Sequence, residues 1–117
     1  MKGKYLSMKP IKINGVESIA TFPVVKGEHQ SELLRRIAQG ERSAREELIC
    51  GSLRLVTSVV TRYFSDYENI DDLFQSGCIG LIYAVDRYDF RYNVKFSTYA
   101  TEMIFGEIRN YLHKDQS

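Results

Sequence analysis

A chain of 117 residues is long enough for one domain with a modest core and too short for two. Its apolar and charged fractions, 44% and 26%, are those of a globular protein and exclude both a disordered chain and a membrane protein. The lysine-bearing N-terminus has no apolar core of the kind a secretory signal needs. Cys50 and Cys78 are isolated, which indicates free thiols, no metal site and a cytoplasmic protein.

Charge is unevenly distributed along the chain, although the net charge is only +1. Residues 1–65 carry eleven Lys/Arg against six Asp/Glu, residues 66–85 carry four acidic residues and no basic one, and residues 86–117 carry five of each. A basic front half followed by a short acidic patch is not the strong single-sign field of a protein that binds duplex DNA by charge alone.

The N-terminal residues 1–29 show no helical period. An Asn-Gly pair with weak alternation around it is a hairpin signal, but no partner sheet is evident, so a loosely ordered arm is favoured over a folded hairpin. Helical patterning begins at Ser31, a candidate cap for a short helix that Gly40 ends. We therefore predict an arm at 1–29 and a helical domain at 30–117.

A long second helix is predicted from Ser43 to about residue 64. Ser43 and Glu46 have the spacing of a capping box, in which each side chain can bond the backbone amide of the other residue. Behind this box, apolar residues recur at helical spacing as far as Phe64, across Gly51.

A third helix is predicted to start near Ile70. Gly77 and Gly80 lie within one turn of it and cost roughly 1 kcal/mol each, which indicates close approach by another helix. After a connecting loop, a fourth helix is predicted with Ser97 or Thr98 as its cap. The predicted fold class is all-α, a compact bundle of about four helices.

Asp71 and Asp72 at the start of the third helix have two interpretations. Acidic residues in a first turn complement the helix dipole, so this stretch could be a solvated helix start. Neither carboxylate is paired with a base or a metal ligand in the sequence, which argues against acid–base catalysis. We expect no enzyme and no cofactor.

The stretch RYDFRYNVKFSTY interleaves five aromatic rings with three cations in thirteen residues. Proteins bind single-stranded nucleic acid with aromatic rings that stack on the bases and cations that neutralise the phosphates. The alternative is that the rings fill the core, which helical spacing supports for one or two of them. The residues concerned are Arg87, Tyr88, Phe90, Arg91, Tyr92, Lys95, Phe96 and Tyr99.

Three motifs, SLRLVTSVVTRYF, DDLFQSGCIGLIYAVDRYD and KFSTYATEMIFGEIRNYL, follow one another in an order and at separations that resemble region 2 of the sigma-70 family of bacterial RNA polymerase sigma factors. The resemblance covers about residues 31–114. The ending and the lead-in are most similar to the stress and sporulation branch, especially the late forespore factors. Family members continue beyond the position of Ser117, so the resemblance implies a fragment or a short form.

The resemblance implies two partners, of which the first is core RNA polymerase. In the family, the helix with the pattern DLxQxGxxGL docks on the clamp helices of the β′ subunit, and the acidic patch could meet basic residues there. A glutamate and an asparagine of the housekeeping branch are replaced here by a serine and a cysteine. The matching positions are Asp72, Gln75, Ser76, Cys78 and Ile82.

The second implied partner is the non-template strand of the promoter −10 element. The resemblance implies that a flipped adenine stacks on Tyr99, at a cost of a few kcal/mol for unstacking. The residues around it would be Lys95, Phe96 and Thr98, and Arg91 would meet phosphates.

Other positions match the family less closely. Ser52 and Leu55 match a pocket for a second flipped base, where residue 52 is commonly asparagine in the family. Arg109 matches a position facing the upstream duplex. Glu102 and Met103 stand where housekeeping factors carry two tryptophans that act as a wedge, so weaker promoter melting is expected.

A second hypothesis is a sigma-like interaction module whose partner is an anti-sigma factor or the clamp alone. Both hypotheses require the docking surface, and only the first requires Tyr99. No membrane partner is expected, since no apolar run approaches the roughly 20 residues that span a bilayer.

Overall fold

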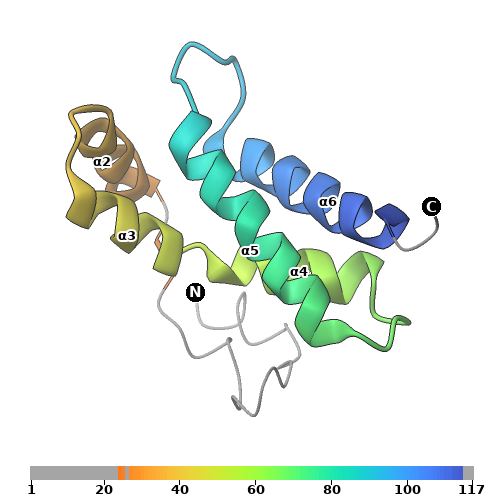
Figure 1. Ribbon diagram of the computed structural model, residues 1–117. Coiled ribbons are helices and arrows are strands. Elements are labelled where there is room, and N and C mark those ends of the chain that lie inside the picture. Colours follow the sequence, from red (N-terminus) through yellow and green to blue (C-terminus); the bar gives the residue numbers. More distant parts are fainter. Residues whose placement is uncertain (1–23, 26, 115–117) are drawn as a thin grey trace.

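The computed structural model describes residues 24, 25 and 27–114, which form five α-helices and no strand (Figure 1). The all-α prediction is therefore confirmed. The candidate hairpin lies outside the described residues, as does most of the predicted arm. The helices are α2 (Gly27–Ala38), α3 (Arg42–Cys50), α4 (Leu53–Tyr63), α5 (Ile70–Arg87) and α6 (Phe96–Lys114).

The two helix starts predicted at Ser31 and Ser43 are wrong, because neither hydroxyl caps a helix in the structure. Ser31 lies inside α2, and Ser43 lies inside α3, whose N-cap is Glu41 with no side-chain capping bond. The carboxylate of Glu41 instead accepts hydrogen bonds from the guanidinium of Arg36. This ion pair closes the turn between the two helices, so the Ser43–Glu46 capping box does not form.

The predicted long helix is two helices, because the chain turns at Gly51 and Ser52. The backbone amide of Val25 donates to the Gly51 carbonyl at 3.1 Å. A Cβ atom at position 51 would come within 2.3 Å of Val25 Cγ2. The segment before α2 therefore packs directly onto the turn between α3 and α4. Helical periodicity in the sequence does not predict a contact between segments so far apart in the chain.

The last helix begins at Phe96, earlier than either predicted cap. Its first backbone bond runs from the Tyr99 amide to the Lys95 carbonyl at 3.0 Å. Phe96 is only 2% exposed, so burial of its ring sets where the helix enters the core. Ser97 and Thr98 consequently lie within the first turn and cap nothing.

The core lies where α4 packs against the hairpin formed by α5 and α6, which run side by side in Figure 1. Gly77 faces Val56 of α4, and Gly80 faces the backbone of α6. The prediction of close helix approach at these glycines is confirmed. The fully buried large side chains are Leu33, Leu48, Leu73, Leu81, Ile104, Ile108, Val56 and Val60.

Candidate nucleic-acid interface

Tyr88 holds together a cluster of aromatic rings where the loop after α5 meets the start of α6. Its ring centroid lies 5.7 Å from that of Tyr99 and 5.5 Å from that of Phe96, while Tyr92 lies 5.4 Å from Tyr99. The Tyr88 hydroxyl donates to the Val94 carbonyl at 2.8 Å. The rings of Tyr88 and Tyr92 therefore tie the loop to the start of α6.

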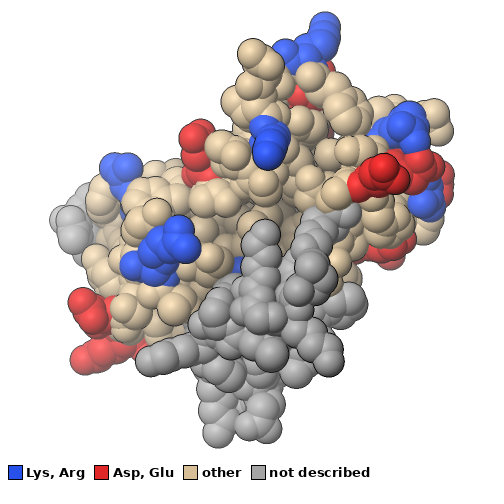
Figure 2. Space-filling model, turned by 180° about the vertical axis from the view of Figure 1, so that it is seen from behind, with Lys and Arg blue, Asp and Glu red and all other residues tan. Residues whose placement is uncertain are grey.

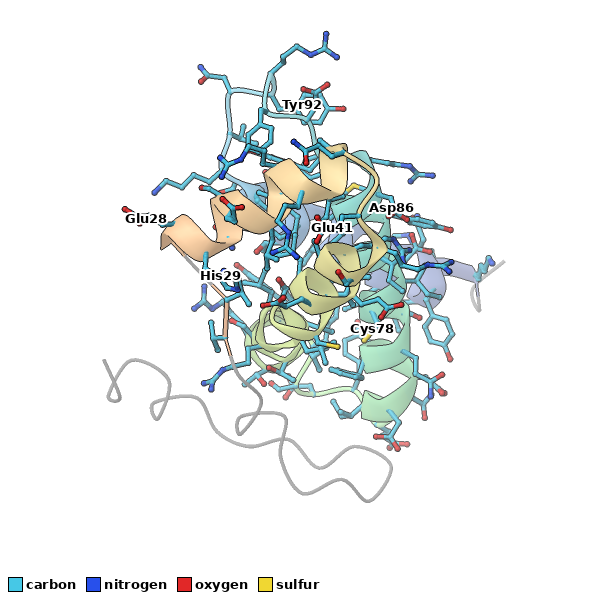
Figure 3. All side chains as sticks on the ribbon, turned by 90° about the vertical axis from the view of Figure 1, so that its left-hand side faces the viewer. Glu28, His29, Glu41, Cys78, Asp86 and Tyr92 are labelled. Atoms are coloured by element: carbon cyan, nitrogen blue, oxygen red, sulfur yellow. The ribbon has the colours of Figure 1, made fainter. Side chains whose placement is uncertain are left out.

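The rings of this cluster divide into supporting and exposed members. Phe96 belongs to the core and cannot stack a base without leaving it, so it supports its neighbours from below. Tyr99 is half-buried, whereas Phe90 and Tyr92 are 56% and 43% exposed. Figure 3 shows Tyr92 at the end of the molecule, in the loop. The core-filler interpretation thus holds for Phe96 and fails for the two exposed rings.

Arg91 is exposed on the same loop and is already engaged by a carboxylate. Its guanidinium donates to Asp89 Oδ2 at 2.7 Å, and its backbone amide donates to Asp89 Oδ1 at 2.8 Å. These hydrogen bonds lower the pKa of Asp89 to about 2. A phosphate at Arg91 would therefore compete with an internal carboxylate, whereas the exposed Lys95 makes no ion pair with any described residue.

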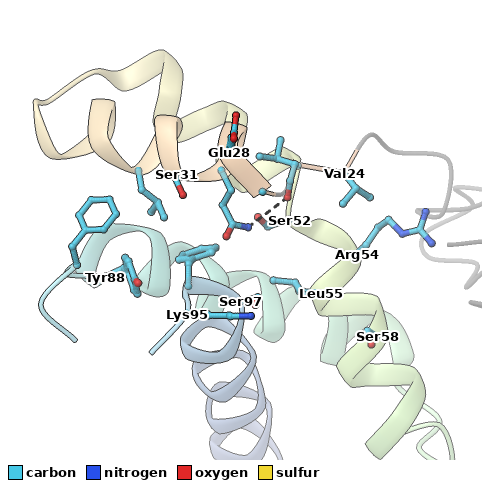
Figure 4. A pocket seen from close by; sticks show the side chains of 17 residues that line it. Val24, Glu28, Ser31, Ser52, Arg54, Leu55, Ser58, Tyr88, Lys95 and Ser97 are labelled. Atoms are coloured by element: carbon cyan, nitrogen blue, oxygen red, sulfur yellow. Dashed lines mark hydrogen bonds between the residues drawn. The ribbon is translucent and has the colours of Figure 1, made fainter. Parts of the chain in front are cut away.

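A pocket of about 930 Å³ lies between α2, the start of α4 and the start of α6 (Figure 4). It brings Ser52 and Leu55, the predicted pocket residues, together with Lys95. Ser52 is 4% exposed, and its hydroxyl has no hydrogen-bond partner among the described residues. The pocket is therefore apolar in part, and the buried Ser52 hydroxyl lies in its wall.

The wall contributed by α2 was not predicted. Its Gln30 side chain donates to the Val25 carbonyl at 3.5 Å at the pocket edge. Helical patterning places apolar residues on one face of α2 but does not predict which part of the domain that face packs against. A smaller hollow of about 390 Å³, lined by Leu55, Ser97, Thr98, Thr101 and Glu102, continues along α6.

The residues of α6 that were predicted to bind DNA lie on different faces of the helix. Thr98, Glu102 and Arg109 are exposed and recur at spacings of four and seven, so they share the outward face. Met103 is half-buried, and its backbone packs against Gly80 of α5. Glu102 and Met103 therefore do not point the same way, although they are adjacent in sequence.

The predicted polymerase-binding residues of α5 also differ in their exposure to solvent. Asp72 and Gln75 are exposed, Cys78 and Ile82 are half-buried on the flank, and Ser76 is only 8% exposed and faces inward. Asp72 accepts a hydrogen bond of 3.2 Å from the Tyr111 hydroxyl. The five positions thus do not form one surface.

Two exposed residues of the same α5 face were missed, namely Ile79 and Tyr83, which are 44% and 38% exposed. The guanidinium carbon of Arg87 lies 4.4 Å from the centre of the Tyr83 ring. Their spacing of seven and eleven from Asp72 was the signal in the sequence that could have found them. The face is therefore acidic at its start and apolar in its middle.

The charge pattern of the surface is mixed. In the view of Figure 2, Lys and Arg lie in separate small groups, several of them beside Asp or Glu. An ion pair links α3 to α5: the Arg45 guanidinium binds both oxygens of Asp86, at 2.6 and 3.1 Å, and lowers the pKa of that carboxyl. No broad single-sign patch covers the part of this face that is described.

Burial affects one further titratable group on α5. The Cys78 thiol is partly enclosed, and this burial raises its pKa to about 11. Among the described residues, no cluster of three His, Cys, Asp or Glu side chains is placed to hold a metal ion. Within the same part of the chain, no helix has the length and apolar character needed to cross a membrane.

Comparison with known proteins shows the family of the chain. Residues 48–117 match the Sigma-70 region 2 family. The chain is 50% identical over 107 residues to a Bacillus thuringiensis subsp. kurstaki protein provisionally named RNA polymerase sigma-G factor, an alignment that covers 92% of this chain and 85% of that protein.

Two longer relatives are also RNA polymerase sigma factors. The RNA polymerase sigma-G factor of Bacillus subtilis (strain 168) is 49% identical over 108 residues, which cover 92% of this chain and 41% of the factor. The RNA polymerase sigma-F factor of Priestia megaterium is 45% identical over 93 residues, or 80% of this chain and 37% of the factor. The chain thus spans about two fifths of these two relatives.

The family match defines a domain of transcription initiation factors. The chain belongs to the sigma-70 family and contains its region 2, the part of sigma factors that binds core RNA polymerase and recognises the promoter −10 element. Among its relatives are the sporulation factors sigma-G and sigma-F.

Proposed function

We propose that this chain docks on the β′ clamp helices of core RNA polymerase and holds the non-template strand of the −10 element as the duplex opens. The observation that carries the proposal is the joint placement of the Tyr88–Tyr92–Tyr99 rings and the Ser52–Leu55 pocket, both at the start of α6. Rings for one unstacked base and a pocket for another are what such a strand requires.

Tyr99 is the ring we assign to the first flipped base. Its ring contacts those of Tyr88 and Tyr92 and is only half-buried, so it is held in place while still accessible. Thr98 and Lys95 are exposed beside it and would meet the sugar–phosphate backbone. Arg91 would contribute only after leaving Asp89.

The second base would enter the larger pocket, where the Ser52 hydroxyl has no protein partner and Leu55 offers an apolar wall. A base that hydrogen-bonds this hydroxyl would satisfy a group that is otherwise buried at a cost. Ser52 is shorter than asparagine, so the pocket is expected to hold its base less tightly than the family pattern would.

Docking on polymerase is assigned to the exposed face of α5. Asp72 and Gln75 lie at its start, and Ile79 and Tyr83 provide apolar contact area in its middle. An acidic start followed by an apolar centre suits a basic partner helix. Since promoter and polymerase are cytoplasmic in bacteria, so is the proposed place of action.

Binding of a fluorescent −10 non-template oligonucleotide and of its scrambled version, at two salt concentrations, tests the DNA half of this proposal. Tyr99→Ala is expected to weaken binding about 5- to 150-fold, the range of one base–ring stack, and Tyr99→Phe is expected to retain most of it. Equal binding of both sequences that disappears with salt would reduce the interaction to charge alone.

A matched variant separates the two surfaces. Tyr83→Ala also removes a partly exposed tyrosine, but from α5, so it should lower binding to core polymerase and leave the oligonucleotide affinity unchanged. The alternative function is an interaction module that binds an anti-sigma factor or the clamp without reading DNA. That alternative is favoured if Tyr99→Ala changes nothing while Asp72→Arg abolishes polymerase binding.

A further inference from the structure

The loop between α5 and α6, residues 88–95, is held by hydrogen bonds among its own residues. The Tyr92 amide donates to the Asp89 carbonyl at 2.9 Å, and the Val94 amide donates to the Tyr92 carbonyl at 2.6 Å. The Asp89 carboxylate also accepts a hydrogen bond of 2.8 Å from the Arg91 amide. These bonds fold the segment into successive turns, so the loop follows a defined path.

Tyr88 connects both ends of this loop. Its backbone amide donates to the Ala84 carbonyl at 2.9 Å, at the point where α5 ends. Its hydroxyl reaches across the loop and donates to the Val94 carbonyl at 2.8 Å. Its half-buried ring contacts the rings of Phe96 and Tyr99 in the first turn of α6. One residue therefore joins the end of α5, the end of the loop and the start of α6.

The hydroxyl and the ring of Tyr88 have separate structural effects. The contacts with Phe96 and Tyr99 involve the ring alone, so a phenylalanine at position 88 would keep them. The hydroxyl bond lies at the surface, where Val94 is exposed, and contributes little to the packing of the helices. It fixes the carbonyl of Val94 shortly before the chain enters α6. The hydroxyl therefore acts on the loop rather than on the core.

The loop in turn determines how two of the rings lie together. Tyr92 belongs to the loop and Tyr99 to α6, so the distance of 5.4 Å between their ring centroids depends on the path of the loop. Tyr88 contacts both of these rings and also lines the pocket beside Ser52 (Figure 4). A bond that fixes the loop therefore fixes the arrangement of the rings on which a base would stack.

We propose that Tyr88 is a positioning residue, whose hydroxyl holds the loop in place before DNA arrives, so that the strand meets a surface that is already ordered. This inference rests on the proposed function and adds how its ring surface is assembled. A loop that became ordered only on binding would lose conformational freedom at that step. The apparent affinity would then fall with the fraction of molecules whose loop is in place.

Direct contact between the Tyr88 hydroxyl and DNA is the competing role. In the free chain this hydroxyl already donates its proton to Val94, so it could only accept a hydrogen bond from DNA without giving up that bond. The two roles affect different rate constants. Binding that must wait for the loop slows association, whereas the loss of a direct contact speeds dissociation.

Tyr88→Phe removes the hydroxyl and keeps the ring. In the 117-residue chain, it is expected to weaken binding of the −10 non-template oligonucleotide about 2- to 10-fold, the worth of one hydrogen bond. Stopped-flow measurement should show most of this loss as slower association. Tyr99→Ala, which removes a ring assigned to a base, should instead speed dissociation. The melting temperature of Tyr88→Phe should stay close to that of the wild type, because the bond lies outside the core.

Trypsin cleavage after Arg91 measures the opening of the loop in the absence of DNA. Arg91 is exposed on the loop, and Arg62, which is exposed in the last turn of α4, serves as the reference site. Tyr88→Phe should raise the rate of cleavage after Arg91 about 2- to 10-fold, because cleavage follows the population of the open loop. The rate after Arg62 should not change.

Tyr111→Phe is the matched control. Its hydroxyl also donates a hydrogen bond, of 3.2 Å to Asp72, but it lies near the end of α6 and not at the loop. This variant should change neither the affinity for the oligonucleotide nor the rate of cleavage after Arg91.

Three results would overturn the positioning role of Tyr88 alone. The first is a Tyr88→Phe chain that binds the oligonucleotide as tightly as the wild type. The second is faster dissociation with unchanged cleavage after Arg91, which would assign the hydroxyl to direct DNA contact. The third is faster cleavage after both arginines with a lower melting temperature, which would assign it to overall stability. A wild-type chain that does not bind the −10 strand would overturn the proposed function and this inference together.

Discussion

Gly80 of α5 lies directly against the backbone of Met103 in α6. A Cβ atom at position 80 would come within 2.6 Å of the Met103 carbonyl oxygen and 2.8 Å of the Ile104 Cα atom. Backbone atoms cannot rotate away as a side chain can, so this contact sets how closely the two helices approach. It therefore also sets which residues of α6 face outward.

Gly80→Ala should destabilise the fold by about 1–3 kcal/mol, because the added methyl group forces the two helices apart. Gly106→Ala is the matched control: it also replaces a glycine inside a helix, but nothing lies within 4 Å of the added Cβ. It should stabilise by about 0.5–1 kcal/mol through helix propensity. Urea unfolding of both variants measures the difference, and equal effects would contradict the close contact.

The Arg45–Asp86 ion pair should make stability depend on pH in acid. The pKa of Asp86 is lowered in the folded protein, so its contribution is present above the unfolded value of about 3.9 and is lost as pH falls through the folded pKa. Asp86→Asn should lower the melting temperature slightly at pH 7, as expected for an exposed pair worth about 0–1 kcal/mol.

The gap between wild type and Asp86→Asn should therefore close as the melting temperature is measured from pH 7 down to below pH 4. Arg45→Ala should behave similarly, because it removes the other partner of the pair. A gap that stays constant over this range would show that the bond does not stabilise the junction of α3 with α5.

The two cysteines should differ in reactivity. Cys50 is exposed, whereas burial raises the pKa of the Cys78 thiol to about 11 and restricts its access. At pH 8, iodoacetamide should modify Cys50 at least about ten-fold faster than Cys78, since the thiolate is the nucleophile. Mass spectrometry of Cys50→Ser and Cys78→Ser variants assigns each rate, and similar rates would indicate that α5 opens readily.

Ser52→Ala should separate stability from binding. The Ser52 hydroxyl is buried without a hydrogen-bond partner among the described residues, so its removal should leave the melting temperature unchanged or raise it. If a flipped base uses that hydroxyl, affinity for the −10 strand should fall about 2- to 10-fold, the worth of one hydrogen bond. Lower stability together with unchanged affinity would argue that the hydroxyl has a structural role instead.

The sequence resemblance implies that Glu102 and Met103 stand where housekeeping factors carry a tryptophan wedge, which gives a prediction for a full-length factor that contains this chain. Without two adjacent rings, promoter opening should depend strongly on a good −10 match. Permanganate footprinting with core polymerase measures this, and efficient opening of poor −10 sequences would contradict it.

Local pattern in the sequence was sufficient for the helix class and for part of the site. The apolar spacing after Ile70 predicted α5, and two glycines in one of its turns predicted the close contact with another helix. The three motifs also led to the family that the comparisons show. All of these are properties of residues near one another in the chain, where periodicity and spacing are direct physical signals.

Contacts between residues that are distant in the sequence determined the helix break at Gly51, the exposure of the aromatic rings and the pocket. Val25 packs on Gly51 and divides a helix that its own sequence pattern predicts to be continuous. Burial separates Phe96 in the core from Tyr92 on the surface, although both belong to one motif. The pocket beside Ser52 exists because α2 covers it. Exposure and packing depend on which element lies opposite, and only the tertiary structure specifies that.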